Sequence, residues 1–347
     1  MYKPNFSISP QMNNLIAQIE AARVRIDSAS ILPEQEIALR YKAAIESVHS
    51  STSIEGNPLN QNQVKQALAG KLNRWERSVI EVTNYKKAWD WVGTKAKGKR
   101  TLTLKEILSL HKLVMKDLLP EEKVGHLRPG PVYIVDIVGK KEVLKYTGPE
   151  AITLISLLRE LFAWANENPL ELHPVLLAGI FHYEFVSIHP FSDGNGRVTR
   201  LLVKLILDRA GYDFRGSLVL DKYYWQNQTK YYEALNQASN YQEQREANLD
   251  PWLDYYVTGF YEVVKELGQQ IDLLKHIGIN KSEIRLNSDE IQILDYLQQF
   301  DQANLQDLLD ILQVPERTVQ RRIKGLVDRG LVRRVGEGKK TVYVLKK

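Results

Sequence analysis

One stretch of twelve residues, from His189 to Arg200, brings together side chains that could carry out chemistry. It reads His-Pro-Phe-Ser-Asp-Gly-Asn-Gly-Arg-Val-Thr-Arg, so a titratable base, a carboxylate, two glycines and two arginines lie within one short segment. Apolar runs at 176–188 and 198–207 lead into it and out of it. The pattern therefore predicts a tight loop between two buried helices.

Four residues of this loop have the properties of a phosphate cradle. Gly194 and Gly196 permit a sharp turn and let backbone N–H groups approach a ligand closely. The helix predicted to follow presents an N-terminus, which attracts anions. Arg197 and Arg200 lie three residues apart on one face of that helix, where both can bind phosphate oxygens.

Two further residues complete a reactive set. Asp193 can hold a hard cation such as Mg²⁺, which usually takes one or two protein carboxylates together with nucleotide phosphates. His189 can deprotonate an incoming hydroxyl near neutral pH. A phosphate cradle, a metal ligand and a base together predict a phosphoryl- or nucleotidyl-transfer site. The sequence contains neither a Walker motif nor an EF-hand loop.

The bulk composition is ordinary for a soluble globular protein and excludes several kinds of chemistry. The chain has 347 residues, enough for two or three domains, and is 44% hydrophobic and 26% charged. It has no cysteine, which excludes disulfides, a thiolate nucleophile and a thiolate zinc site. No apolar run is long enough to cross a bilayer, and the N-terminus has no apolar signal core. We therefore expect a cytoplasmic protein with no membrane partner.

The elements that must position the loop are predicted to be mainly helical. Apolar spacing predicts helices at about 11–27, 34–54, 61–96, 102–118, 149–168, 173–188, 197–210, 220–240 and 251–276. The exception is a β-hairpin predicted over 132–146, around Gly139. A lone hairpin is not stable by itself, so it must pack on the helices. It serves either as a flap beside the site or as a structural element.

A second polar segment ends the helix predicted at 34–54. It reads Ser51-Thr-Ser-Ile-Glu55-Gly56, and it places Glu55 at a helix C-terminus. A carboxylate there faces the negative end of the helix dipole, which costs about a few tenths of a kcal/mol. Glu55 is therefore either a solvated side chain that tolerates this cost or one with a cationic partner elsewhere.

The C-terminal segment has a helical pattern of its own and most of the positive charge. Three short helices are predicted between 288 and 328, followed by two short strands, which is typical of a winged helix-turn-helix. Residues 316–347 hold eleven Lys and Arg against three acidic residues, so this segment carries +8 and the remainder of the chain −3. The charge predicts a polyanion, or else a protein, as a partner at 287–347.

The loop at 189–200 matches the motif H-x-F-x-D/E-G-N-G-R-x-x-R at every specified position, so the sequence resembles the Fic family. The resemblance extends over roughly 1–270, and Ser51–Gly56 resembles the family's inhibitory motif, S/T-x-x-x-E-G/N. It implies a Fic-type helical bundle with a β-hairpin flap, and transfer of AMP from ATP to a Tyr, Thr or Ser hydroxyl of a target protein or of the chain itself.

The resemblance also implies roles for the loop residues. His189 would be the catalytic base, and Asp193 would hold Mg²⁺ on the α- and β-phosphates of ATP. The backbone at Gly194 and Gly196 would bind the anion, and Asn195 would help to position the α-phosphate.

The arginines and the inhibitory segment have implied roles of their own. Arg197 would contact the β-phosphate and Arg200 the γ-phosphate. Glu55, with Ser51 and Gly56 beside it, would pair with Arg200 and so restrain the enzyme. This would give Glu55 its cationic partner.

The resemblance implies the binding partners as well. Tyr231 and Tyr232 lie where related chains line the adenine pocket, although aromatic residues at such spacing more often belong to a core. The hairpin 132–146 would dock the target protein by strand addition.

The resulting organisation has four parts. These are an N-terminal helical region at 1–95 with the inhibitory helix at about 34–56, a Fic core at 96–277, a linker at 278–286 and a winged helix-turn-helix at 287–347.

Two other interpretations stay open. In the first, Glu55 positions a water molecule and the enzyme removes AMP from its target. In the second, the chain is chiefly a DNA-binding transcriptional regulator. Arg317, Arg321 and Lys324 on the helix predicted at 316–328 suit a DNA groove, as do Lys339 and Lys340 in the predicted wing. The sequence also leaves a homodimer open as the assembly.

Overall fold

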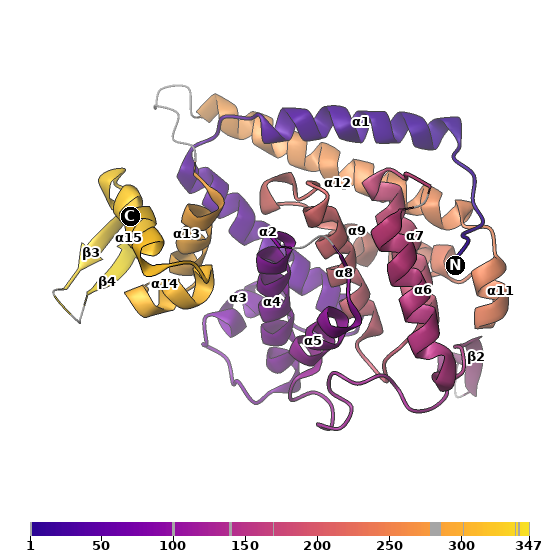
Figure 1. Ribbon diagram of the computed structural model, residues 1–347. Helices are drawn as coiled ribbons and strands as arrows, with labels where there is room; N and C mark the ends of the chain where they lie inside the picture. Colours follow the sequence, from indigo (N-terminus) through magenta and orange to yellow (C-terminus); the bar gives the residue numbers. More distant parts are fainter. Residues whose placement is uncertain are drawn as a thin grey trace.

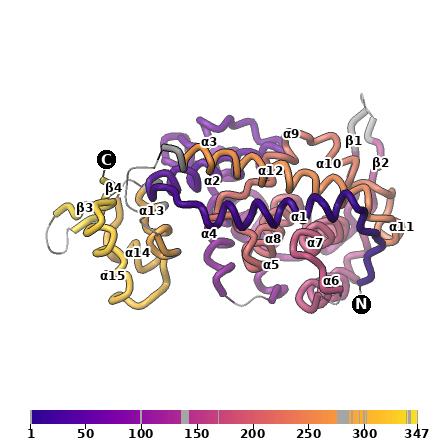
Figure 2. The backbone as a smooth tube through the Cα atoms, turned by 90° about the horizontal axis from the view of Figure 1, so that it is seen from above, coloured from indigo at the N-terminus to yellow at the C-terminus, as the bar shows by residue number. Residues whose placement is uncertain are grey.

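The computed structural model describes residues 2–98, 101–138, 141–168, 170–277, 286–300, 302–336, 338 and 341–346. Figure 1 shows a mainly helical molecule, as predicted, in which two long helices, α1 (Pro10–Asp27) and α12 (Asp250–Ile277), run side by side. Viewed from above, in Figure 2, the same two helices cover one side of the bundle. The predicted linker lies almost wholly outside the described residues.

The other described helices before α12 form the rest of the bundle. They are α2 (Pro33–Ile54), α3 (Gln61–Leu68), α4 (Arg77–Ala96), α5 (Leu104–Met115), α6 (Leu154–Glu167), α7 (Pro174–Ile188), α8 (Asn195–Arg209), α9 (Leu220–Gln226), α10 (Gln228–Leu235) and α11 (Tyr241–Glu246). Short 3-10 turns lie at Ala151–Thr153 and Phe214–Gly216.

Local sequence signals set several helix starts. Ser9 caps α1 by accepting a hydrogen bond from the N–H of Met12 at 3.1 Å, and Pro10 follows at the first helical position. Thr103 and Glu106 form a capping box at the start of α5. These caps satisfy backbone groups that a helix end leaves unpaired.

Two predicted helices were too long. The helix expected at 61–96 is divided into α3 and α4, because Gly70 leaves the helical region with a φ of +69° and a turn follows. The helix expected at 220–240 is divided at Asn227, whose φ of −122° and ψ of 38° are not helical, and it ends at Leu235. Helix α11, which follows, was not predicted.

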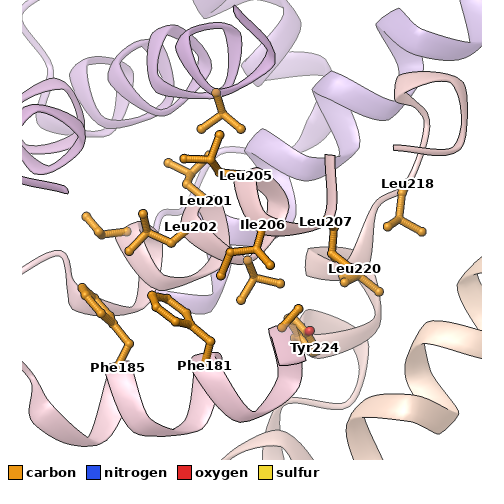
Figure 3. Close-up of a cluster of buried hydrophobic side chains, with 14 of the residues drawn as sticks. Phe181, Phe185, Leu201, Leu202, Leu205, Ile206, Leu207, Leu218, Leu220 and Tyr224 are labelled. Carbon is orange, nitrogen blue, oxygen red and sulfur yellow. The ribbon is translucent and has the colours of Figure 1, made fainter. Parts of the chain in front are cut away.

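The helices on both sides of the motif loop pack against each other in the main core. Every side of α7 is buried, and α8 turns a leucine-rich face toward it. Figure 3 shows Phe181 and Phe185 of α7 opposite Leu201 and Leu202 of α8. Burial of such a side chain contributes about 1.5–3 kcal/mol, so the loop is fixed at both ends by strongly stabilised helices.

The predicted β-hairpin is present and packs on the helical core. Its strands are β1 (Tyr133–Val138) and β2 (Lys141–Thr147), paired antiparallel with a register shift between Ile134 and Val135. Tyr146 is buried and donates a hydrogen bond to the carbonyl oxygen of Ser187 at 2.6 Å. That contact joins the hairpin to the end of α7, next to the motif loop.

The C-terminal segment has a second hydrophobic cluster. It contains the helices α13 (Ser288–Phe300), α14 (Leu305–Leu312) and α15 (Glu316–Asp328) and an antiparallel pair, β3 (Val332–Val335) and β4 (Val342–Leu345). Ile37 of α2 is buried in the same cluster. Figures 1 and 2 both place this segment at the opposite end of the molecule from the β1–β2 hairpin. The winged helix interpretation stays a prediction, and Lys339 and Lys340 lie outside the described residues.

No helix in the described ranges is long and apolar enough to cross a membrane.

Candidate active site

Two residues with left-handed backbone conformations shape the motif loop. His189 ends α7 with a φ of +49°, and Gly194 immediately precedes α8 with a φ of +81°. Gly194 also has no room for a side chain, because a Cβ there would lie 2.6 Å from Sδ of Met115. The loop therefore requires glycine at this position for both its conformation and its close packing.

The interior of the loop is braced by buried side chains. The amide of Asn195 accepts a hydrogen bond from the N–H of Phe191 and donates one to its carbonyl oxygen, both at 2.9 Å. The Phe191 ring stacks on His111 of α5, with their centroids 3.9 Å apart. Both ends of the Asn195 amide thus hold the loop, and its expected role in positioning a phosphate stays a prediction.

His111 has a defined tautomer in this arrangement. Its Nδ1 accepts a hydrogen bond from the N–H of Gly125 at 2.9 Å, so Nε2 carries the proton and donates to the carbonyl oxygen of Asp193 at 3.1 Å. Burial lowers the pKa of His111 to about 4, which keeps the ring neutral near pH 7. His111 therefore anchors the backbone of Asp193 and takes no proton at neutral pH.

Replacing His111 with alanine is expected to destabilise the protein by about 2–4 kcal/mol. The change leaves a cavity against Phe191 and leaves the N–H of Gly125 and the carbonyl of Asp193 without partners. Urea unfolding measures the effect, with His126→Ala as the control because His126 is exposed. Equal midpoints for the two variants would contradict the assigned role.

His189 is held as a neutral base. Its Nδ1 lies 3.2 Å from the carbonyl oxygen of Val186, which can only accept a hydrogen bond, so Nδ1 carries the proton and Nε2 is free to accept one. Burial lowers the pKa of His189 below its usual range, and the Glu55 carboxylate partly opposes this shift. Arg128 fixes the backbone by donating from Nε to the His189 carbonyl oxygen at 2.8 Å.

Arg197 is enclosed by carboxylates from two elements. One terminal nitrogen is bonded to Glu81 of α4, and Nη2 donates to Oδ1 of Asp193 at 3.0 Å. The Arg197 side chain is 4% exposed, whereas that of Asp193 is 39% exposed. Asp193 is thus the member of this group that solvent and ligands can reach.

The second motif arginine is bound by the C-terminal end of α2. Nη2 of Arg200 donates to Oε1 of Glu55 at 2.8 Å and to the carbonyl oxygen of Ser51 at 2.9 Å, while Nε donates to Oγ of Ser51 at 2.7 Å. Asp221 of α9 adds a carboxylate oxygen 3.4 Å from Nε. The structure therefore contains the cationic partner expected for Glu55, and Gly56 ends the helix with a φ of +88°.

Glu55 also lies in the expected phosphate cradle. A Cβ built on Gly196 would collide with Oε1 of Glu55, so this oxygen is placed directly against the first turn of α8. Backbone N–H groups at a helix N-terminus attract anions. The Glu55 carboxylate thus occupies the position that a phosphate group would take in the expected cradle.

The two tyrosines expected near the adenine differ in their surroundings. Tyr231 is buried, and its hydroxyl lies 2.9 Å from Nε2 of His182, so it belongs to the core. Tyr232 is 41% exposed and lies close enough to Glu55 for the carboxylate to add to the burial that raises its pKa. Tyr232 is the one of the pair that a ligand can reach.

The residues present fit one nucleotide-bound Mg²⁺. Oδ2 of Asp193 lies 3.9 Å from Nη2 of Arg77 and is exposed enough to bind a cation. Within the described ranges no group of three or more His, Asp or Glu side chains could hold a metal. A single carboxylate is what a metal held mainly by nucleotide phosphates and water requires.

Four residues of the site were missed by the sequence reasoning: His111, Arg128, Glu81 and Asp221. None lies in the motif, and each comes from a distant element. For Arg128, the sequence shows only its place in the run Gly125-His-Leu-Arg128-Pro-Gly before the hairpin, and its burial as a structural brace is seen only in the structure. The other three have no local signal.

The fold and the motif loop between two buried helices can now be compared with known proteins. Residues 101–207 match the model of the Fic/DOC family. "Protein adenylyltransferase Fic" of Drosophila erecta is 31% identical over 229 residues, which cover 64% of this chain and 43% of that protein. Its counterpart in Drosophila virilis is 32% identical over 220 residues, 61% of this chain and 42% of the relative.

Solved structures agree on the fold. A Fic family protein from Desulfovibrio desulfuricans G20 has a TM-score of 0.64 and 24% identity, and the match covers 99% of this chain and 98% of that one. Fic-1 from C. elegans has a TM-score of 0.58 and 22% identity, covering 76% and 73% of the two chains. The prediction of a Fic-type, mainly helical fold is confirmed. The chain spans less than half the length of the curated relatives it matches.

Proposed function

We propose that this protein is an adenylyltransferase that moves AMP from ATP to a hydroxyl group of a target protein or of itself. The observation that carries the proposal is the combination of a neutral His189, an exposed Asp193 and an anion-binding helix end within one loop. The Drosophila relatives, which share 31–32% identity with this chain, are named protein adenylyltransferases, and this supports the reaction.

The chain's own groups suffice to assign each part of the reaction. Nε2 of His189 accepts the proton of the target hydroxyl as its oxygen attacks the α-phosphorus, and diphosphate leaves. The N-terminus of α8 and the guanidinium of Arg197 stabilise negative charge on the phosphates. Asp193 would hold Mg²⁺, which supplies further charge neutralisation when bound.

The exposed hairpin is the proposed docking place for the target. Tyr133, Val135 and Leu144 are exposed on its strands, which form a two-stranded sheet with a further bridge from Thr147 to Asn240 at its end. An extended target segment can add to a free strand edge through main-chain hydrogen bonds. The proximity of Tyr146 to the end of α7 would bring such a segment near His189.

We further propose that Glu55 is an autoinhibitory residue. It binds Arg200 and lies against Gly196, so it removes a phosphate ligand and also places a negative charge where a phosphate would bind. Arg200 itself stays fixed by Ser51 and Asp221, which come from α2 and α9. Removal of the Glu55 carboxylate would therefore open the cradle while leaving Arg200 in place.

Labelled ATP tests the reaction directly. Purified protein and cell lysate are incubated with ATP labelled at the α- or the γ-phosphate, using wild type, Glu55→Gly and His189→Ala. The proposal expects protein labelling from the α-position that depends on His189. Labelling from the γ-position would overturn it. A chase of labelled protein without ATP tests the alternative, AMP removal that depends on Glu55.

A second function is favoured by one surface. Helix α15 buries Val319, Ile323 and Leu326 and exposes a polar face, which consists of Arg317, Gln320, Arg321 and Lys324. The three cations of this face, unlike Arg322 of the same helix, form no ion pair with another described residue. Arginines and lysines on one helix face suit phosphates and base edges of duplex DNA. We infer that this face binds DNA.

DNA binding is expected to be strongly salt-dependent. Replacing Arg317, Arg321 and Lys324 with alanine should lower the slope of log affinity against log salt by about 2–3, since each phosphate contact contributes about 0.9. Fluorescence anisotropy with a labelled duplex, at salt concentrations between about 50 and 200 mM KCl, measures this slope. The control replaces the exposed Lys65, Lys71 and Lys87. Identical slopes for the two triple variants would exclude this face.

A further inference from the structure

Glu81 lies outside the motif, yet it is the main partner of Arg197. It comes from the first turns of α4 and is mostly buried, with 13% of its side chain exposed. The guanidinium of Arg197 is held between Glu81 on one side and Asp193 on the other. Because an unpaired buried charge is unfavourable, Glu81 determines where this guanidinium can rest.

One hydrogen-bond donor of Arg197 has no partner among the described residues. Its Nε is buried and has no hydrogen-bond partner among the described residues. Buried N–H groups are nearly always satisfied, so an unpaired one beside an anion-binding helix end indicates a place for an acceptor oxygen. A nucleotide phosphate is the acceptor that fits the proposed function. Glu81 thus holds an arginine that still has one unpaired donor.

Glu81 is itself attached to the segment that carries Glu55. Its Oε2 accepts a hydrogen bond from Nδ2 of Asn57 at 2.7 Å, and the same Nδ2 lies 3.0 Å from the carbonyl oxygen of Ser78. Asn57 follows Glu55 by two residues. The short segment 55–57 is therefore connected to both motif arginines. Glu55 binds Arg200 directly, and Asn57 is linked to Arg197 through Glu81.

We propose that Glu81 is a positioning residue that orients Arg197 toward the β- or γ-phosphate of the nucleotide, and that Asn57 ties this orientation to the inhibitory segment. The inference rests on the proposed function and adds a carboxylate outside the motif to it. A positioning role and a purely structural role of Glu81 predict different effects on nucleotide binding. Loss of Glu81 must weaken binding of the phosphates that Arg197 touches and leave the remainder of the nucleotide unaffected.

Calorimetric titration with two probes tests this difference. The full chain carrying Glu55→Gly is titrated with ATP and magnesium and, separately, with AMP, which lacks the β- and γ-phosphates. Adding Glu81→Gln is expected to weaken ATP binding about tenfold, the size of one lost charge-assisted contact, and to leave AMP binding unchanged. Asn57→Ala is expected to weaken ATP binding about two- to threefold, because Glu81 keeps its ion pair. The control is Glu76→Gln, an exposed carboxylate at the start of the same helix.

The outcomes are separable. Unchanged ATP binding in Glu81→Gln, or an equal loss for ATP and AMP, would overturn the positioning role while the proposed function stands. If the Glu55→Gly parent binds neither nucleotide, the proposed function and this inference both fail. Thermal unfolding of each variant confirms that all the proteins compared are folded.

Discussion

Replacing Glu55 with glycine is expected to raise the initial rate of AMP transfer about 10- to 100-fold at saturating ATP and magnesium. A hydrogen bond to a charged group contributes about 1.5–3 kcal/mol, and each 1.4 kcal/mol corresponds to a factor of ten. The Glu55–Arg200 bond is of this kind, at 2.8 Å, with the arginine side chain 2% exposed. Incorporation of α-labelled phosphate into protein over time measures the rate.

Two further variants separate the effects of charge and volume. Glu55→Gln keeps the volume against Gly196 but removes the charge, so its rate is expected to lie between those of wild type and Glu55→Gly. Glu76→Gly is the matched control, because it removes an exposed carboxylate at an N-cap where glycine is tolerated. If Glu55→Gly labels no faster than wild type, the autoinhibitory role of Glu55 is wrong.

The motif loop was predictable because its polar residues and the apolar runs that form its flanking helices are contiguous in the sequence. The apolar runs on both sides of residues 189–200 predicted two buried helices, and the positions of α7 and α8 agree with them closely. Glu55 was predictable for a different reason. A carboxylate at a helix C-terminus is either solvated or paired with a cation, and the resemblance indicated Arg200 as that cation.

The residues that hold the loop in place could not be predicted in this way. Glu81 and Asp221 look like ordinary helical carboxylates in the sequence, because pairing with Arg197 and Arg200 depends on how α4 and α9 pack against α8. The bracing of the loop by the Asn195 amide was also not foreseen, because it depends on the folded loop bringing Phe191 next to it. Periodicity also extended helices through Gly70 and Asn227, where local backbone conformation ends them.

The three-dimensional arrangement changes how the proposed inhibition by Glu55 would work. From sequence, Glu55 would act by taking Arg200 away from a phosphate. In the structure Arg200 is fixed by Ser51 and Asp221 as well, and Glu55 lies against Gly196 at the start of α8, where the proposed phosphate cradle is. Displacement of one carboxylate is a smaller change than movement of an arginine. This arrangement favours a site that is assembled in the resting protein and blocked only by Glu55.

Loss of the base is expected to give the largest effect. His189→Ala should reduce AMP transfer by about 10²–10⁴-fold, the range over which a positioned general base contributes. The Glu55→Gly protein is the suitable parent, because its higher rate leaves room to measure the loss. His126→Ala, at an exposed position, is the control. A reduction below tenfold would mean that another group accepts the proton.

The pH dependence of the same parent tests the state of His189 more closely. Burial lowers the pKa of His189 from its ordinary value of 6.5, so the base is neutral at pH 7, and activity is lost only as the pH falls through the lowered pKa. The nearby Glu55 carboxylate raises the pKa of His189 within this environment, so its removal should shift the midpoint further toward acid. Rates between pH 5 and 8, a range chosen to bracket the usual histidine pKa of about 6.5, should show a plateau above neutrality. A midpoint at or above the ordinary histidine pKa would contradict a buried, neutral base.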